Sequence, residues 1–153
     1  MCPARNPTLT QPTLRAATAA DAQGIRDLLE RSGLPTSDLA AARPEFVILS
    51  SGGQIIGIGG LERFGSVALL RSVAVEPRQQ RSGAGRLIVA DLEQRARTAG
   101  IRELILLTLT ARNFFERLGY RAKPRDQVPP SVLDSAEFRS LCPASAVCMA
   151  KTL

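Results

Sequence analysis

The feature that most constrains the fold is an apolar run that leads through a basic, glycine-bearing loop into an amphipathic segment. The run at 67–75 is rich in Val and Leu, which is typical of a strand. After Pro77 and the loop, apolar residues recur at helical spacing from about Gly85 to Thr98, and Gly100 ends this segment. The sequence therefore predicts a strand, a loop and a helix in direct succession.

The predicted loop has the properties of a site for a large anion. Free backbone N–H groups at a helix N-terminus point outward and carry the positive end of the helix dipole. Gly83 and Gly85 have no Cβ, so a bulky anion can approach these groups closely. Arg78, Arg81 and Arg86 add positive charge around them. We interpret the loop as a cradle for a pyrophosphate.

The spacing of the glycines distinguishes between classes of phosphate-binding loop. A Walker A loop needs Gly-Lys-Ser/Thr, which is absent. A dinucleotide fingerprint needs a third glycine where this chain has Ile88, although Glu103 lies near the right distance for a ribose contact. The pattern that fits is Gln/Arg-x-x-Gly-x-Gly, which is present as Gln80 to Gly85.

The remaining segments predict a mixed α/β (α+β) domain. Strands are expected at 14–17, 46–49, 54–63, 67–75, 103–107, 120–123 and 146–150. Helices are expected from Thr18 or Asp21 to Gly33, and at 37–42, 85–98, 111–118 and 132–141, with 124–130 as a loop. Short connections make the three strands between 46 and 75 an antiparallel meander. Gly57, Gly59 and Gly60 interrupt the middle strand, which indicates a bulge, the close approach of another backbone or a ligand, or tight packing of a helix.

Composition excludes several classes of function. The chain has no histidine, which excludes His-based triads, imidazole bases and zinc sites with His ligands, and we expect no metal. Lys and Arg outnumber Asp and Glu by 20 to 14, and the net charge of +6 favours anionic partners. No apolar run approaches the roughly 20 residues of a membrane span, so we expect no membrane partner.

Length and cysteine content favour a single domain in a reducing compartment. The 153 residues suit one domain at 13–153, preceded by a mobile segment at 1–12 that has three prolines and no apolar signal-peptide core. Three cysteines, Cys2, Cys142 and Cys148, are too few for a disulfide scaffold, although Cys142 could pair with Cys148. We expect a cytoplasmic protein.

A second motif strengthens the interpretation of the loop. Ala111-x-x-Phe114-Phe115-Glu116-Arg117-Leu118-Gly119-Tyr120 follows the loop at a fitting distance. Together with the loop motif and its flanks, it resembles the GCN5-related N-acetyltransferase (GNAT) superfamily over about 14–120. This resemblance implies a sheet of six to seven strands, in which the meander is joined to parallel strands, and the strand that ends near Val75 splays apart from the strand that begins at Glu103.

The resemblance also implies acetyl-CoA as acetyl donor and a small-molecule amine as acceptor. The pantetheine arm would pair with exposed backbone in the splay, and the amine would attack the thioester directly. The residues that the resemblance assigns to acetyl-CoA are Val73, Val75, Gln80, Arg81, Ser82, Gly83, Ala84, Gly85, Arg86, Phe114 and Phe115. A homodimer is expected from the resemblance alone.

The general acid of many family members is a tyrosine, and this chain has Phe115 in its place. Phenylalanine cannot donate a proton. Tyr120 is expected to pack in the core and is not assigned the role. The alternatives are that Thr108, Thr110 or a water molecule protonates the thiolate, or that the thiolate leaves without a general acid.

Three further residues are candidates for the acceptor side of the cleft. Glu62 is a candidate base, directly or through water, and the alternative is a solvated surface charge. Arg71 could hold a substrate carboxylate bidentately, and the alternative is a surface pair with an acid. Ser72 is expected to line the same cleft and is, with Glu62 and Thr108, a candidate catalytic residue.

Two segments narrow the resemblance within the superfamily. The stretch 106–115 resembles amino-acid acetyltransferases of the N-acetylglutamate synthase type. The tail at 129–149, which includes Leu-Cys-Pro-Ala-Ser-Ala, resembles GNAT proteins named for arsenic resistance, whose relatives acetylate arsinothricin or phosphinothricin. This implies an anionic, amino-acid-like acceptor. Cys142 and Cys148 could bind trivalent arsenic as thiolates, and the favoured alternative is two buried small apolar side chains.

Two other classes of function stay open. Phe115 and the absence of histidine are compatible with a non-catalytic acetyl-CoA sensor or a partner-binding module. The arginines of the loop and of the following helix could bind nucleic acid. No aromatic residue interleaves them, so nucleic acid is the weaker alternative.

Overall fold

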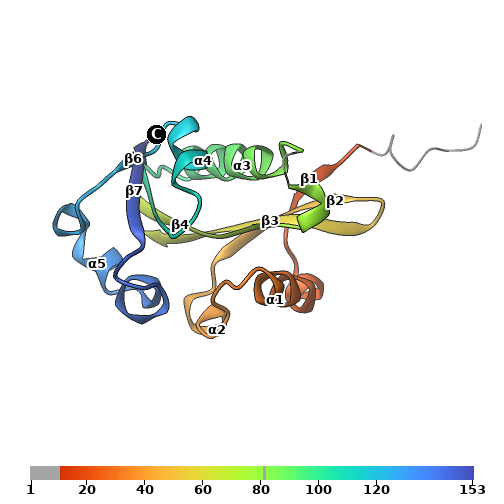
Figure 1. Cartoon of the computed structure of the whole chain (residues 1–153), viewed down its shortest axis with the longest axis horizontal. Coiled ribbons are helices and arrows are strands. Elements are labelled where there is room, and N and C mark those ends of the chain that lie inside the picture. The colour runs from red at the N-terminus through yellow and green to blue at the C-terminus, as the bar shows by residue number, and fades with distance from the viewer. Residues whose placement is uncertain (1–10, 81) are drawn as a thin grey trace, which may run out of the picture.

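The computed structural model describes residues 11–80 and 82–153 and has one mixed sheet with helices on both faces (Figure 1). The seven strands lie in the order β1-β2-β3-β4-β5-β7-β6. Their bounds are β1 Thr13–Ala16, β2 Glu45–Ser51, β3 Gln54–Phe64, β4 Val67–Val75, β5 Glu103–Thr108, β6 Arg121–Ala122 and β7 Val147–Thr152. The predicted fold class and the antiparallel meander β2-β3-β4 are confirmed.

The helices divide between the two faces of the sheet (Figure 1). They are α1 Ala22–Arg31, α2 Leu39–Ala42, α3 Ala84–Thr98, α4 Arg112–Arg117 and α5 Pro130–Leu133, followed by a π-helical turn, η5, at Glu137–Leu141. α3 packs on β2, β3 and β4, and α1 packs on β3 and β4 from the other side. Among the described residues, no helix is long and apolar enough to cross a membrane.

The predicted single helix at 132–141 is wrong. The chain instead forms α5, a break, and then η5. Pro130 stands in the first turn of α5, where its fixed φ and missing N–H are tolerated, so the helix starts earlier than apolar spacing indicates. The predicted loop at 124–130 also contains a short 3-10 turn at Arg125–Gln127.

Strands β4 and β5 run parallel and separate after three pairs. The pairs are Val67 with Glu103, Ala68 with Leu104 and Leu69 with Ile105. β4 continues to Val75, and no strand of the described chain pairs with its β5-facing edge beyond Leu69. We call the stretch 71–75 along this side the free edge of β4. The splay that the family resemblance implied is therefore confirmed.

A β-bulge interrupts β4 where the free edge begins. Gly60 pairs with Arg71 and Ile58 pairs with Ala74, so Gly59 alone lies opposite Ser72 and Val73. Gly59 also lies close under α3, because a Cβ there would come within 2.7 Å of Ile88 Cγ2. Tight packing of a helix on Gly59 is therefore confirmed, whereas the extra residue of this bulge belongs to β4 and not to the glycine-bearing strand β3.

Three apolar clusters hold the layers together. The largest lies between α3 and the sheet and includes Ile88, Leu92 and Leu104, all with no exposed surface. The second joins α1 to β2 and β3 through Leu28, Leu29 and Ile48, among others. The third joins the sheet to the C-terminal segment and includes Leu69, Ile105, Val132 and Phe138.

Candidate active site

The N-terminus of α3 has the geometry of an anion cradle. Gly83 precedes the helix with φ of +89°, which is the left-handed region that favours glycine, and no side chain of the described residues caps the first turn. A Cβ on Gly85 would lie 3.1 Å from Phe114 Cζ, so a larger residue would press against α4. The first N–H groups of a helix have no partner within it and can bind an anion.

The rest of the predicted acetyl-CoA loop folds against the end of β4. Gln80 Nε2 donates a hydrogen bond to the carbonyl of Val75 at 3.4 Å, and the Ser82 hydroxyl donates to the carbonyl of Gln79. Ala84 is buried and Arg86 is exposed. Arg81, which the sequence assigns to this loop, lies outside the described residues.

Strands β4 and β5 carry the predicted residues Ser72 and Thr108 at equivalent positions beyond their last pair. Ser72 is three residues past Leu69, and Thr108 is three residues past Ile105, the last parallel pair. Thr108 Oγ1 accepts a hydrogen bond from the backbone N–H of Ala111 at 3.0 Å, which leaves its own proton available. Their catalytic roles stay predictions.

Arg71 lies at the centre of a buried ion cluster that the sequence did not predict. Its Nη1 and Nη2 bind the two carboxylate oxygens of Asp38 at 2.6 and 2.8 Å, and Nη1 also binds Glu62 Oε1 at 3.1 Å. Its Nε lies 3.5 Å from Glu137 Oε1 and donates to Ser72 Oγ at 3.2 Å. The Arg71 side chain has no exposed surface. We call Asp38, Glu62, Arg71 and Glu137 the Arg71 cluster.

The cluster contradicts the two alternatives in which Glu62 and Arg71 are surface charges. Glu62 is not a solvated surface charge, because its side chain is 12% exposed and ion-paired. Arg71 does pair with acids, but not at the surface. Each of the three guanidinium nitrogens of Arg71 already has an acceptor or a counter-charge within the protein. To bind a substrate carboxylate as predicted, Arg71 would have to exchange one of these contacts.

Burial and crowding of carboxylates shift the pKa of Glu137 within the cluster and of Cys142 beside it. Burial raises the pKa of Glu137 to about 7, while Arg71 lowers it and Asp38 and Glu62 raise it further. Burial and the charge of Glu137 raise the pKa of Cys142 to about 11. At neutral pH, Glu137 is therefore close to half-protonated, and the Cys142 thiol keeps its proton.

The sequence missed Asp38 and Glu137 as members of the cluster. Asp38 lies 33 residues before Arg71 in a short connecting segment, and Glu137 belongs to the segment predicted as a plain helix. The available signal was weak: an acidic residue on an otherwise apolar helical face indicates a buried partner.

The aromatic residues of the second motif lie in the core. Phe115 packs edge-to-face against Phe114 and Tyr120, with ring centroids 5.0 and 5.4 Å apart. Tyr120 has no exposed surface and donates a hydrogen bond to Glu93 Oε2 at 2.8 Å. Burial and the nearby Glu93 carboxylate raise the pKa of Tyr120. The prediction that Tyr120 packs in the core is confirmed, and the roles of Phe114 and Phe115 in binding stay predictions.

The cysteines do not form a metal centre in the described residues. Cys142 is half-buried, Cys148 is buried and both are free thiols, while Cys2 lies outside the described residues. No group of three His, Cys, Asp or Glu residues within 11–80 and 82–153 could hold a metal ion.

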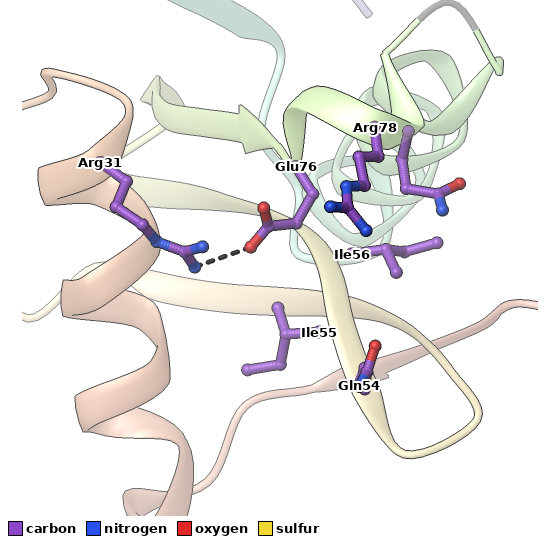
Figure 2. A pocket seen from close by; sticks show the side chains of 7 residues that line it. Arg31, Gln54, Ile55, Ile56, Glu76 and Arg78 are labelled. Atoms are coloured by element: carbon purple, nitrogen blue, oxygen red, sulfur yellow. Dashed lines mark ion pairs between the residues drawn. The ribbon is translucent and has the colours of Figure 1, made fainter.

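A separate cavity of about 460 Å³ lies beside the start of the loop (Figure 2). An ion pair of 2.7 Å between Arg31 of α1 and Glu76 crosses it. Its lining is completed by Gln54, Ile55, Ile56, Arg78 and Gln79. It therefore lies on the β3 and α1 side of β4, away from the splay between β4 and β5.

Comparison with known proteins identifies relatives of the same kind. A model of the acetyltransferase (GNAT) family matches residues 15–120. The amino-acid acetyltransferase of Aeromonas salmonicida is 32% identical over 124 residues, which are 75% of this chain and 28% of that protein. An uncharacterized N-acetyltransferase of Chlorobaculum tepidum is 30% identical over 114 residues, which are 71% of each chain. The chain spans less than a third of the length of the amino-acid acetyltransferases that it matches.

Solved structures agree with the fold. N-acetylglutamate synthase of Neisseria gonorrhoeae, complexed with coenzyme A and N-acetyl-glutamate, superposes with a TM-score of 0.80 at 23% identity over 94% of this chain and 35% of that one. Rv2747 of Mycobacterium tuberculosis, solved in complex with CoA, superposes with a TM-score of 0.79 at 27% identity over 92% of this chain and 99% of that one. The family match covers the cradle, the free edge and the second motif, and the chain belongs to the acetyltransferase (GNAT) family.

Proposed function

We propose that the protein is an acetyl-CoA-dependent N-acetyltransferase whose acceptor is the amino group of a small, amino-acid-like molecule. The observation that carries the proposal is the uncapped N-terminus of α3, with Gly83 and Gly85, next to the free edge of β4. A pyrophosphate fits the first feature and an extended arm fits the second.

The residues present fit acetyl-CoA. The loop from Gln80 to Arg86 would hold its pyrophosphate, and the backbone of Val73 and Val75 would pair with its arm along the free edge. When bound, acetyl-CoA supplies the acetyl group as a reactive thioester. Backbone N–H groups at the bulge can stabilise charge that develops on a carbonyl oxygen next to them.

We assign proton transfer to two carboxyl groups of the Arg71 cluster and to the hydroxyl of Thr108. Glu62 was predicted as the base, and Glu137 adds a carboxyl whose pKa of about 7 suits exchange of a proton at neutral pH. The Thr108 hydroxyl keeps a proton that it can donate to a leaving thiolate. Phe115 is buried and can supply none.

We further propose that the acceptor is anionic, as arsinothricin, phosphinothricin and glutamate are. The net charge of +6 and the amino-acid acetyltransferases among the relatives support this finer proposal. Because Arg71 already pairs with three carboxylates, an anionic acceptor needs another cation or must replace one of these carboxylates.

The first test is mass spectrometry of the protein with acetyl-CoA and a panel of glutamate, uncharged amino acids, phosphinothricin, arsinothricin and a cationic amine. Gain of one acetyl group on a panel member supports the enzyme. Gain confined to the phosphinic and arsinic analogues makes detoxification of such compounds the function. Preference for the cationic amine overturns the anionic acceptor.

A binding titration separates the enzyme from a sensor and from a protein that does not bind acetyl-CoA. Gly83→Glu places a negative charge in the cradle and is expected to abolish acetyl-CoA binding. Gly65→Glu is the matched control, because both glycines have positive φ and neither Cβ would meet an atom within 4 Å. Binding without acetyl transfer to any panel member favours a sensor. Equal loss in both variants would contradict the cradle.

A further inference from the structure

Ser72 adopts a backbone conformation that needs support from its surroundings. Its φ of +58° lies in the left-handed region, and Arg43 is the only other non-glycine residue within 11–80 and 82–153 with a positive φ. A serine there is strained relative to glycine. Ser72 is also the first of the two residues that form the bulge of β4. The conformation of the free edge therefore depends on what holds this residue.

Arg71 contacts the Ser72 side chain and is itself fixed from three directions. Its Nε donates to Ser72 Oγ at 3.2 Å. Its carboxylate partners come from separate parts of the chain: Asp38 from the residue before α2, Glu62 from β3 and Glu137 from the start of η5. A guanidinium held this way has little freedom to rotate, so the donor to Ser72 points in one direction.

The position of this contact matters because the free edge begins there. Leu69 makes the last pair with β5, and Arg71 and Ser72 follow it by two and three residues, where β4 has no strand partner on this edge in the described chain. A bulge turns the backbone groups that follow it. Whatever fixes Ser72 also sets the direction of the Val73 amide and carbonyl.

We propose that Arg71 is a positioning residue, which holds Ser72 and the bulge of β4 and thereby sets the direction of the backbone groups on the free edge. The inference deepens the proposed function and rests on it, since that edge is where the arm of acetyl-CoA would pair. It assigns the cluster a role other than binding the acceptor's carboxylate. It also explains why a residue from the far C-terminal segment reaches this strand.

The alternative is an ion cluster that only stabilises the fold, and two conservative variants distinguish the two. Arg71→Lys keeps the charge among the three carboxylates but loses the planar fork that serves Asp38 and Ser72 together. Ser72→Ala removes the acceptor and leaves the cluster intact. Ser135→Ala is the matched control, because Ser135 Oγ is buried without a hydrogen-bond partner among the described residues.

The first readout is the amide ¹⁵N–¹H chemical shift of Val73 in the free protein, which needs no ligand. Arg71→Lys and Ser72→Ala are expected to move this signal in the same direction, while Ser135→Ala leaves it in place. In the double variant the second change is expected to add little, because both remove one contact. Additive shifts, or an unmoved signal in either single variant, would overturn the proposal.

The second readout compares acetyl-CoA with adenosine 3′,5′-bisphosphate, which lacks the pantetheine arm. Both variants are expected to weaken acetyl-CoA binding roughly two- to tenfold, the range for one lost hydrogen bond, and to leave the bisphosphate unaffected. Equal weakening of both ligands, or none, contradicts a role at the free edge. If the wild type does not bind acetyl-CoA, the proposed function fails, and the Val73 signal still decides whether Arg71 holds the bulge.

Discussion

The strongest quantitative prediction concerns Glu137 and the dependence of stability on pH. Burial raises its pKa from 4.5 to about 7 in the folded protein. Between these values the folded protein keeps the proton that the unfolded chain has lost, so stability falls as pH rises through this window. At about 1.4 kcal/mol per pKa unit, the loss is at most about 3 kcal/mol and is complete slightly above pH 7.

Glu137→Gln removes this dependence, because glutamine keeps the shape and hydrogen-bonding capacity of a protonated glutamate. The groups that face Glu137 are Arg71, Asp38, Glu62 and Cys142, and they are the same in both proteins. The variant is therefore expected to match the wild type near pH 4.5 and to exceed it by up to about 3 kcal/mol at pH 8.

The assay is urea unfolding of both proteins at intervals from pH 4.5 to 8.5, analysed as the difference between them so that other titrating groups cancel. Asp134→Asn is the matched control, because it removes an exposed carboxyl three residues earlier in the same segment. It is expected to give a flat difference. A flat difference for Glu137→Gln as well, or one that favours the wild type more as pH rises, refutes the reasoning.

Three further substitutions test the packing around the site. Tyr120→Phe leaves Glu93 Oε2 without its 2.8 Å hydrogen bond and should lower the unfolding free energy by about 1–3 kcal/mol, measured in urea, with kcat unchanged. Gly59→Ala places a Cβ within 2.7 Å of Ile88 Cγ2 and should cost about 1–3 kcal/mol; an unchanged melting temperature would contradict the tight packing of α3. Ser135→Ala removes a buried hydroxyl that has no partner in the described residues, and should raise stability by about 1 kcal/mol in the same assay.

The sequence was informative where the structure depends on local rules. The glycines and arginines after β4 predicted an anion cradle because a helix N-terminus with no Cβ in the way is a local feature. Short turns predicted the meander for the same reason. The bounds of β4 were predicted without error, since its apolar and β-branched residues lie between the turn at Gly65 and Pro77.

The Arg71 cluster could not be predicted in the same way. Its members come from four segments, and no periodicity relates Asp38 or Glu137 to β4. Glu137 was not recognised as a member because the sequence predicted one helix over 132–141. Apolar spacing alone does not reveal the break between α5 and η5. The sequence raised the two candidates Glu62 and Arg71, and the structure shows that they are partners of each other.

The strand order has a consequence for how the chain acquires its structure during synthesis. β7 lies between β5 and β6, and β6 pairs with β7 alone. The strands that precede it can form their meander as they leave the ribosome, since they pair with near neighbours in sequence. β5 can pair with β4 over three residues, but its other edge and β6 have no strand partner in the described chain until residues 147–152 emerge, and until then the nascent chain exposes one edge of a buried strand. A ribosome that stalls before residues 147–152 have emerged would therefore present an aggregation-prone intermediate to chaperones.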